Sequence, residues 1–568
     1  MRSAKPTRLR FLAVVIFIVA AVLISRLYYL QIMKGTSYAE IAERQYSKPY
    51  GQIFDRGTIY FNDKDGDPFI AAGIKTIYTL AIDPKILKND EQVYEKISKI
   101  ITIDKKTFLE KAGKKTDPYE EIANKIDESK AKQITNLKID GVSLYKDKMR
   151  YYPGDNLASQ VIGLLAYKEN ELAGRYGLER EYERTLVRDS QGLYSNFFSE
   201  VFSGINTTID DSQNLEGDIY VSIEPTVQKN LEDKLEEVNK KYSSDLTGGI
   251  IINPKTGEIY AMGVYPDFNI NSFKNEDLKV FSNPIVEGVY EMGSIIKPLT
   301  MAAGIDAGAV TDKTTYDDKG FVESDGKTIW NHDKKGRGII PMQEVLNQSL
   351  NTGVSFVVSK MGTTNFAKYM KAYGLDEKTG IDLPNETSGL MKNLLSDRNI
   401  EYFTASFGQG IAMTPIETVR ALSTLANGGY LISPHLVTKI KHTIGIAESP
   451  KFADSVQILK KSSSEMITKM LVTVVDKALL GGIYKNPHYS VAAKTGTAQM
   501  VDSSTKGYYS DRYLHSFFGY FPAYNPKFLI FMYTVYPKGV DFASHTLTAP
   551  FMDLTKFLIH YYRVPPDR

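Results

Sequence analysis

The sequence predicts a multidomain protein in which a membrane-spanning helix precedes two domains of mixed helices and strands. Three observations lead to this prediction. At 568 residues the chain is too long for one compact core, so two or three domains are expected. An uncharged aliphatic run lies near the N-terminus. Strand-like and helix-like patterns follow one another through the rest of the chain.

The apolar run from Phe11 to Ser25 predicts a single transmembrane helix over residues 11–26. It is shorter than the roughly 20 residues that span a bilayer, but Arg10 and Arg26 can reach the interface at its ends. The cationic residues before it place the tail of residues 1–10 in the cytoplasm and the rest of the chain outside the cell membrane. A cleaved signal peptide is the alternative, and the poor cleavage site at Ala20-Ala21 disfavours it.

Composition excludes several classes of function. A net charge of +2 argues against a nucleic-acid-binding protein, because there is no broad basic excess to neutralise phosphates. The chain has no cysteine, which excludes disulfides, thiolate metal sites and cysteine nucleophiles. Its seven histidines show no His-x-x-x-His pair, so we expect no metal site and no cofactor.

Residues 27–215 predict a non-catalytic α+β domain that serves as a scaffold or docking module. Residues 76–82 alternate like a strand, and the charge-laced stretches 91–101 and 119–137 resemble helices. No cluster with catalytic spacing occurs there. The polar loop at 210–217 is expected to link this domain to the next.

A second domain is expected over residues 216–568. It begins with a strand at 217–223 and a helix that starts at Pro225, whose buried stripe would include Val227, Leu231 and Leu235. Apolar strands at 248–252 and 258–262 then form a hairpin, because the Pro and Gly between them suit a turn.

Ser294 and Lys297 form the candidate nucleophile and base. Three residues apart, they share one face of a helix. A serine hydroxyl needs a base to take its proton, and a lysine can be that base where burial keeps it neutral. The spacing alone is weak, since Ser-x-x-Lys occurs four more times, starting at Ser129, Ser143, Ser324 and Ser503.

Two later motifs distinguish Ser294 from these pairs. Ser349 and Asn351 form a Ser-x-Asn, in which the hydroxyl can relay a proton and the amide can bind a peptide. Lys494-Thr495-Gly496 lies in a strand-like run and is followed by Thr497. The cation and hydroxyls suit a carboxylate, and Gly496 would let an extended peptide approach the strand edge.

Ser-x-x-Lys, Ser-x-Asn and Lys-Thr-Gly in this order are the signature of penicillin-recognising serine enzymes. From Arg26 onward the chain resembles a class B penicillin-binding protein, a monofunctional peptidoglycan D,D-transpeptidase. Phe61-Asn62-Asp63-Lys64 departs from the Asp-Arg-x-Gly expected there. The other shared marks are Arg56-Gly57, Arg150-Tyr151-Tyr152-Pro153, Tyr176-Gly177-Leu178-Glu179, Ser406-Phe407-Gly408-Gln409-Gly410, Thr414-Pro415, 517–522 and Pro537-Lys538-Gly539.

The resemblance implies a pedestal of the dimerisation type and an α/β, β-lactamase-like transpeptidase domain, an antiparallel sheet flanked by helices. It implies that Ser294, activated by Lys297, attacks the D-Ala-D-Ala bond of a stem peptide, with the backbone N–H groups of Ser294 and Thr497 stabilising the oxyanion. Ser349 with Lys494 would protonate the leaving D-alanine. Asn351 would hold the stem amide, and Thr495 and Thr497 the carboxylate. β-Lactams would acylate Ser294.

The resemblance favours the division-type subclass, acting in septal wall synthesis. Its implied partners are a membrane glycan polymerase of the SEDS type and other divisome proteins. A D,D-carboxypeptidase, a β-lactamase, a β-lactam sensor and a catalytically silent scaffold are the alternatives. Tyr508, Tyr509 and Tyr513 are interpreted as core or surface aromatics in preference to cleft residues.

Overall fold

In the computed structural model the chain divides by its contacts into two compact units, which are described separately. One contains residues 77–148, and the other contains the described residues of 55–76, 149–189 and 194–568. The predicted tail and transmembrane helix lie outside the described residues, as does most of the predicted linker before residue 216. Across the part of the chain that is described, no helix combines the length and apolar character needed to cross a membrane. The structure describes residues 55–168, 171–188, 216–273, 276–443, 447–502, 504–505 and 507–568.

The unit of residues 77–148 packs helices on strands around its own apolar core. Strand β2 (Pro68–Ile82) pairs antiparallel with β3 (Glu120–Ile126), and β4 (Val142–Tyr151) also pairs with β2. Asp104 and Asp127 cap α4 and α5, each accepting a hydrogen bond from a backbone N–H of the first turn. The helices of this unit are α3 (Asp90–Ser98), α4 (Lys105–Ala112) and α5 (Glu128–Asn136).

The helical interpretation of residues 119–137 is wrong for its first half. Residues 120–126 form strand β3, and only 128–136 are helical. β3 lies at the end of its sheet, where charged side chains can face solvent from a strand as easily as from a helix. Charge patterning therefore did not distinguish the two structures here. The strand expected at 76–82 is the second half of β2.

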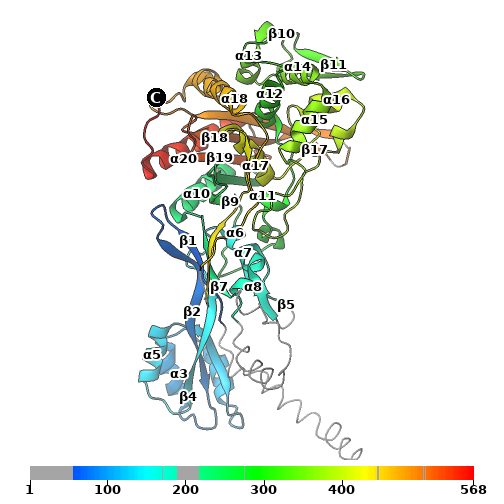
Figure 1. Ribbon diagram of the computed structural model, residues 1–568. Coiled ribbons are helices and arrows are strands. Elements are labelled where there is room, and N and C mark those ends of the chain that lie inside the picture. Colours follow the sequence, from blue (N-terminus) through cyan, green and yellow to red (C-terminus); the bar gives the residue numbers. More distant parts are fainter. Residues whose placement is uncertain are drawn as a thin grey trace, which may run out of the picture. The chain divides into compact units, whose positions relative to one another are not determined.

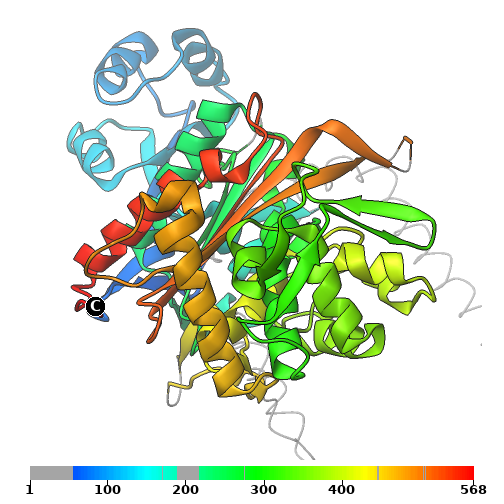
Figure 2. The ribbon, with the colours of Figure 1, turned by 90° about the horizontal axis from the view of Figure 1, so that it is seen from above.

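The larger unit is built on an antiparallel sheet, as the resemblance implied, and the five strands of this sheet have the order β17-β18-β19-β8-β9 (Figure 1). The predicted hairpin forms β8 and β9, and β17 at the opposite edge carries the Lys-Thr-Gly motif. Figure 2 shows the β17–β18 hairpin, in orange, extending beyond the helices that cover the sheet. The strands are β8 (Leu246–Ile252), β9 (Ile259–Tyr265), β17 (Ala492–Asp502), β18 (Gly507–Phe521) and β19 (Phe528–Val535).

Helices cover both faces of this sheet because both faces are apolar. Along β8, Ile250 and Ile252 enter one hydrophobic core and Ile251 enters the other. Helices α10 (Pro225–Tyr242) and α20 (Thr548–Tyr561) pack on the second face, and the predicted stripe of α10 is fully buried. The first face is covered by α12 (Lys297–Asp306), α17 (Pro415–Ala426) and α18 (Lys461–Thr473).

The other elements beside this sheet are short helices and strand pairs. The helices are α11 (Pro284–Glu287), α13 (Met342–Asn347), α14 (Asn351–Met361), α15 (Thr363–Ala372), α16 (Asn399–Ala405), α19 (Ala543–Thr546) and the 3₁₀ turns Leu278–Phe281, Gly293–Ile296, Lys392–Leu395 and Leu479–Gly482, with a π turn at Val474–Ala478. The paired strands are β10 (Thr315–Asp318) with β13 (Gly338–Pro341), β11 (Phe321–Ser324) with β12 (Lys327–Trp330), and β14 (Tyr430–Leu431) with β16 (Val456–Gln457).

A second sheet of this unit contains β1 (Ile59–Asn62), the first residues of β2, β7 (Gly217–Val221) and β15 (Val437–His442). β7, the strand expected at 217–223, pairs parallel with β1 and antiparallel with β15. The remaining elements are α6 (Ser159–Ile162), β5 (Leu165–Lys168), β6 (Glu171–Gly174), α7 (Gly177–Glu181) and α8 (Glu183–Leu186).

Three of the motif stretches noted in the sequence meet in one buried ion-pair network. Glu179, fully buried, accepts hydrogen bonds from Arg56 Nε and Arg150 Nε, both at 2.6 Å, and from the Tyr152 hydroxyl at 3.1 Å. Burial alone would raise the pKa of the Glu179 carboxyl, but the two guanidinium groups hold that pKa below its usual value. The network joins the start of the unit to β4 and α7.

Candidate active site

Ser294 lies in the 3₁₀ turn Gly293–Ile296, directly before the buried helix α12. Gly293 adopts φ +65°, and a methyl group there would lie 2.7 Å from the carbonyl oxygen of Thr497 on β17. A glycine therefore allows the turn to approach the edge strand closely. The Ser294 side chain is half-buried and lines a cavity.

Lys297 is fully buried at the first position of α12. Its Nζ donates to the carbonyl oxygen of Ser349 at 2.5 Å and lies 3.2 Å from Ser349 Oγ. Within the described chain it forms no hydrogen bond with Ser294 and no ion pair. Burial, and then the nearby charge of Lys494, lower the pKa of Lys297 well below the usual value for a lysine.

Ser349 and Asn351 flank the start of helix α14. Ser349 connects α13 to α14 and adopts φ +55°, in the left-handed region that non-glycine residues rarely occupy. Asn351 is the first residue of α14, and its Nδ2 donates to the carbonyl oxygen of Trp330 at 2.8 Å. Both side chains line the same cavity as Ser294.

Lys494 approaches Ser349 from the edge strand β17. Its Nζ donates to Ser349 Oγ at 3.0 Å and to the Thr495 carbonyl oxygen at 3.0 Å. Lys494 is buried without a carboxylate partner among the described residues, and burial lowers its pKa to about 7. The Ser349 hydroxyl is therefore shared by two lysines that are much easier to deprotonate than ordinary ones.

Thr495 and Thr497 line the cavity, and Thr497 Oγ1 accepts a hydrogen bond from Ala543 N at 3.1 Å. Gly496 has a different neighbourhood from the one expected. A methyl group on Gly496 would lie 2.3 Å from Ser516 Oγ and 2.7 Å from the Met292 carbonyl oxygen. The missing side chain thus admits other parts of the protein, in place of the peptide substrate proposed from the sequence.

The cavity has a volume of about 720 Å³, and the predicted site residues that line it are Ser294, Lys297, Ser349, Asn351, Thr495 and Thr497. The preferred interpretation of Tyr513 as a core or surface residue is wrong, because it lines the cavity. Phe407 and Gln409 belong to a stretch noted for its resemblance, and Tyr513 was noted as an aromatic, whereas the other additional residues carried no signal in the sequence. The additional lining residues are Thr328, Ile329, Trp330, His332, Lys334, Thr404, Phe407, Gln409, Gln499, Tyr513, Asp541, Phe542, Ala543 and Ser544.

The arrangement can perform nucleophilic acyl transfer with amine and hydroxyl groups alone. A half-buried serine, two lysines with lowered pKa and a shared second serine supply a nucleophile and a route for protons. Among the described residues, no group of three or more His, Asp or Glu side chains could hold a metal ion.

Comparison with known proteins identifies two domain families in this chain. Residues 247–554 match the penicillin binding protein transpeptidase domain, and residues 54–193 match the penicillin-binding protein dimerisation domain. Stage V sporulation protein D of Bacillus subtilis is 29% identical over 569 residues, which cover 97% of this chain and 85% of that protein. The peptidoglycan D,D-transpeptidase FtsI of Buchnera aphidicola subsp. Schizaphis graminum is 27% identical over 97% of this chain and 94% of its own.

Solved structures show the same fold. Penicillin binding protein 2X from Streptococcus thermophilus superposes with a TM-score of 0.73 at 20% identity, covering 90% of this chain and 80% of that one. Penicillin binding protein 3 from Mycobacterium tuberculosis, complexed with aztreonam, gives a TM-score of 0.68 at 19% identity, covering 91% and 98%. Because the transpeptidase match spans more than half of the 568 residues and a dimerisation match precedes it, the chain belongs to the class B penicillin-binding proteins.

Proposed function

We propose that this protein is a peptidoglycan D,D-transpeptidase that cross-links stem peptides through an acyl-enzyme on Ser294, and that β-lactams acylate the same serine. One observation carries the proposal: Ser294, Lys297 and Ser349, which come from separate elements, line one cavity, and the buried amine of Lys494 lies 3.0 Å from Ser349 Oγ. Relatives of similar length are named peptidoglycan D,D-transpeptidases.

In the first step the Ser294 oxygen attacks the carbonyl carbon between two terminal D-alanines, and its proton passes to neutral Lys297. The oxyanion is stabilised by the backbone N–H groups of Ser294 and Thr497. The Thr497 carbonyl oxygen points towards the turn that carries Ser294, and the N–H of a strand residue lies on the same side as its carbonyl. Each such donor contributes about 3 kcal/mol to catalysis.

In the second step the C–N bond breaks, and the departing D-alanine takes a proton delivered through the Ser349 hydroxyl. An amine of a neighbouring stem peptide then attacks the ester carbon, releases Ser294 and forms the cross-link. Protonated Lys494, with Thr495 and Thr497, binds the substrate carboxylate, and Asn351 binds the stem amide. A cation beside two hydroxyls suits a carboxylate.

The setting is the outer face of the cell membrane, with the chain anchored by residues 11–26 and the N-terminus in the cytoplasm. The uncharged run at 11–25 and the cations before it support this topology. The names of several relatives, FtsI among them, support a role in division. The proposed partners of the protein are a SEDS-type polymerase, which would make the glycan strands, and other divisome proteins.

The test is labelling of the full-length protein in detergent with a fluorescent penicillin. Ser294→Ala should abolish labelling, whereas Ser129→Ala, which removes the serine of an exposed pair with the same spacing, should leave it unchanged. With uncross-linked glycan strands as substrate, wild type should form peptide cross-links. Release of D-alanine without cross-links would point to a carboxypeptidase, rapid loss of the label to a hydrolase, and no label on folded wild type to a scaffold.

A further inference from the structure

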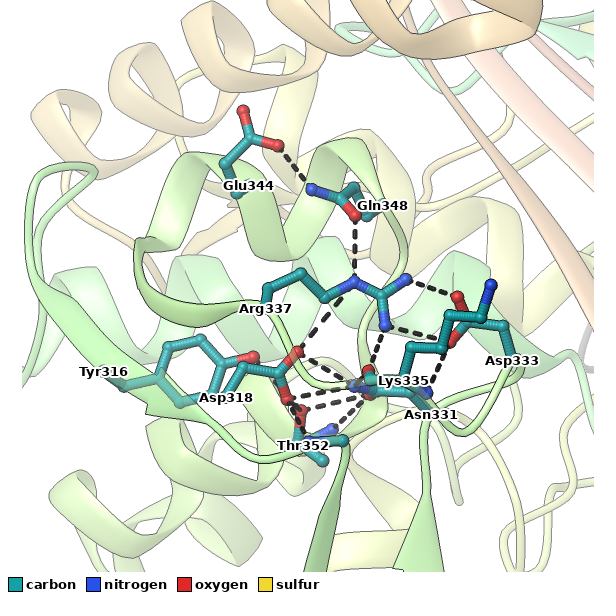
Figure 3. Close-up of polar contacts among 10 residues, drawn as sticks. Tyr316, Asp318, Asn331, Asp333, Lys335, Arg337, Glu344, Gln348 and Thr352 are labelled. Atoms are coloured by element: carbon teal, nitrogen blue, oxygen red, sulfur yellow. Dashed lines mark hydrogen bonds and ion pairs between the residues drawn. The ribbon is translucent and has the colours of Figure 1, made fainter.

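A buried polar cluster reaches Gln348 and Thr352, which lie on either side of the segment that carries Ser349 and Asn351 (Figure 3). It contains Tyr316, Asp318, Asn331, Arg337 and Thr352, and is called the Asp318 cluster below. The chain leaves β10 at Asp318 and returns at the start of β13, so Asn331 and Arg337 lie on the excursion between these strands. Thr352 is the second residue of α14.

Asp318 is the centre of the cluster, and its side chain has no exposed surface. Its carboxylate accepts hydrogen bonds from Asn331 Nδ2 at 3.0 and 3.1 Å, from Thr352 Oγ1 at 2.9 Å and from Gly320 N at 3.0 Å. Arg337 Nε lies 4.0 Å away as its ion-pair partner. A buried carboxylate with this many donors holds each of them firmly in place.

The cluster bonds to the residues on both sides of Ser349. Arg337 Nε donates to Gln348 Oε1 at 3.0 Å. Thr352 N donates to Asn331 Oδ1 at 3.3 Å, and Asn351 Nδ2 donates to the Trp330 carbonyl oxygen at 2.8 Å, next to Asn331. Ser349 thus lies between two anchored neighbours.

Anchoring matters here because the backbone of Ser349 is strained. Its φ of +55° is unfavourable for a residue with a side chain and persists only where the surroundings impose it. In that conformation Ser349 Oγ lies 3.0 Å from Lys494 Nζ and 3.2 Å from Lys297 Nζ. A relaxed Ser349 would move its hydroxyl away from both amines.

The same cluster also fixes a wall of the cavity. Arg337 binds both carboxylate oxygens of Asp333, with N–O distances of 2.9 and 2.8 Å. His332 and Lys334, on either side of Asp333, line the cavity together with Trp330. One guanidinium therefore connects the cavity wall to Gln348, beside the catalytic segment.

We infer that Asp318, Asn331, Arg337 and Thr352 are positioning residues for the transpeptidase reaction, which act through Ser349 and Asn351 without touching the substrate. This inference rests on the proposed function of the same site. It assigns a role in acyl transfer to residues that contribute neither a nucleophile nor a base.

The experiment measures the acylation of the full-length protein by a fluorescent penicillin, with the rate constant of acylation separated from the non-covalent affinity. Thr352→Val keeps the shape of the side chain and removes its hydroxyl. We expect the acylation constant to fall about tenfold while the affinity changes less than about twofold, since one buried hydrogen-bonded group is lost behind the reacting atoms. Thr352→Ser, which restores the hydroxyl, should recover the rate to within about twofold of wild type.

Thr247→Val is the matched control. Thr247 is a buried threonine on β8, and its hydroxyl lies 2.8 Å from Thr534 Oγ1 and 3.3 Å from Asn239 Nδ2. Its loss should lower stability and leave acylation per folded molecule unchanged. If Thr352→Val does not fold, Arg337→Met, at the less buried end of the cluster, should still lower the acylation constant, by roughly threefold.

The outcomes separate the two proposals. Unlabelled wild type would overturn the proposed function itself. If wild type is labelled at Ser294 and both Thr352→Val and Arg337→Met acylate at the wild-type rate, the positioning role is overturned while the function stands. An equal loss of rate in Thr247→Val would overturn it too, because the effect would then follow from stability alone.

Discussion

The side chains of Lys297 and Lys494 converge on a single atom, the hydroxyl oxygen of Ser349, at 3.2 and 3.0 Å. No carboxylate pairs with either amine in the described part of the chain. Two buried ammonium groups at this separation would repel each other, and the charge of Lys494 contributes to the lowered pKa of Lys297. The pair is therefore stable with at most one positive charge, which leaves one neutral amine as a base.

The affinity for penicillin should fall as the pH rises above 7. The ligand carboxylate binds protonated Lys494, whose pKa in the empty site is about 7, so binding above that pH requires uptake of a proton. The non-covalent dissociation constant should rise towards about tenfold per pH unit, up to the pKa of the complex. Stopped-flow labelling between pH 6 and 9 measures it. Lys494→Met should bind weakly without this pH dependence. An affinity in wild type that is flat across the range would contradict the prediction.

Lys494 should also make the protein less stable at low and neutral pH. Its pKa is about 7 when folded and 10.5 in an ordinary environment, so between these values the unfolded chain binds more protons. The resulting penalty is complete below pH 7, shrinks as the pH rises and is absent above 10.5. Lys494→Met should raise the free energy of unfolding at pH 7 and reduce its slope against pH by up to about 1.4 kcal/mol per unit. Urea titrations at several pH values test this. Exposed Lys556→Met is the control, and an unchanged slope in Lys494→Met would refute the argument.

Much of the catalytic framework is predictable from local sequence. The three-residue spacing placed Ser294 and Lys297 on one turn at the start of α12, and the Pro–Gly turn predicted the β8–β9 hairpin. Both features depend on residues close in sequence, where steric and hydrogen-bonding preferences act directly. The stripe of α10 is predictable for the same reason, because a periodic pattern reports which face is buried.

The parts that depend on distant contacts were not predictable. Trp330 reaches the cavity from the end of β12, and His332 and Phe542 reach it from loops, although the local sequence at these positions gives no sign of it. The hydroxyl of Ser349 contacts the amines of two lysines that lie on different elements. Spacing along the sequence cannot predict such a contact between distant residues. The sequence predicted that Gly496 leaves room for substrate. In the structure this room is taken by Ser516 and Met292, which are distant in sequence and approach Gly496 only in the folded chain.

Gly496→Ala should damage the site through packing. The new methyl group would lie 2.3 Å from Ser516 Oγ and 2.7 Å from the Met292 carbonyl oxygen, so β17 and the turn before Ser294 must separate. Overpacking of this kind costs about 1–3 kcal/mol of stability. The acylation rate should fall because Thr497 then moves away from Ser294. Calorimetry and labelling measure the two effects. Ser516→Ala in the same chain should relieve the clash only partly, since the Met292 carbonyl remains. Wild-type labelling by Gly496→Ala would show that this edge tolerates a side chain.

Glu179 should matter for stability and leave the chemistry unaffected. Glu179→Gln keeps the shape of the side chain but removes the negative charge that Arg56 and Arg150 share at 2.6 Å. Arg56 retains Glu183 at 2.6 Å, whereas Arg150 would be left buried with no carboxylate partner in the described chain. Breaking a buried pair in this way costs about 3–5 kcal/mol. Asp233→Asn, which breaks the exposed pair with Lys229, should cost less than about 1 kcal/mol.

Because Glu179 does not line the catalytic cavity, penicillin labelling per folded molecule should stay at the wild-type level in both variants. A loss of labelling in folded Glu179→Gln, or a stability equal to that of Asp233→Asn, would contradict a purely structural role for this network.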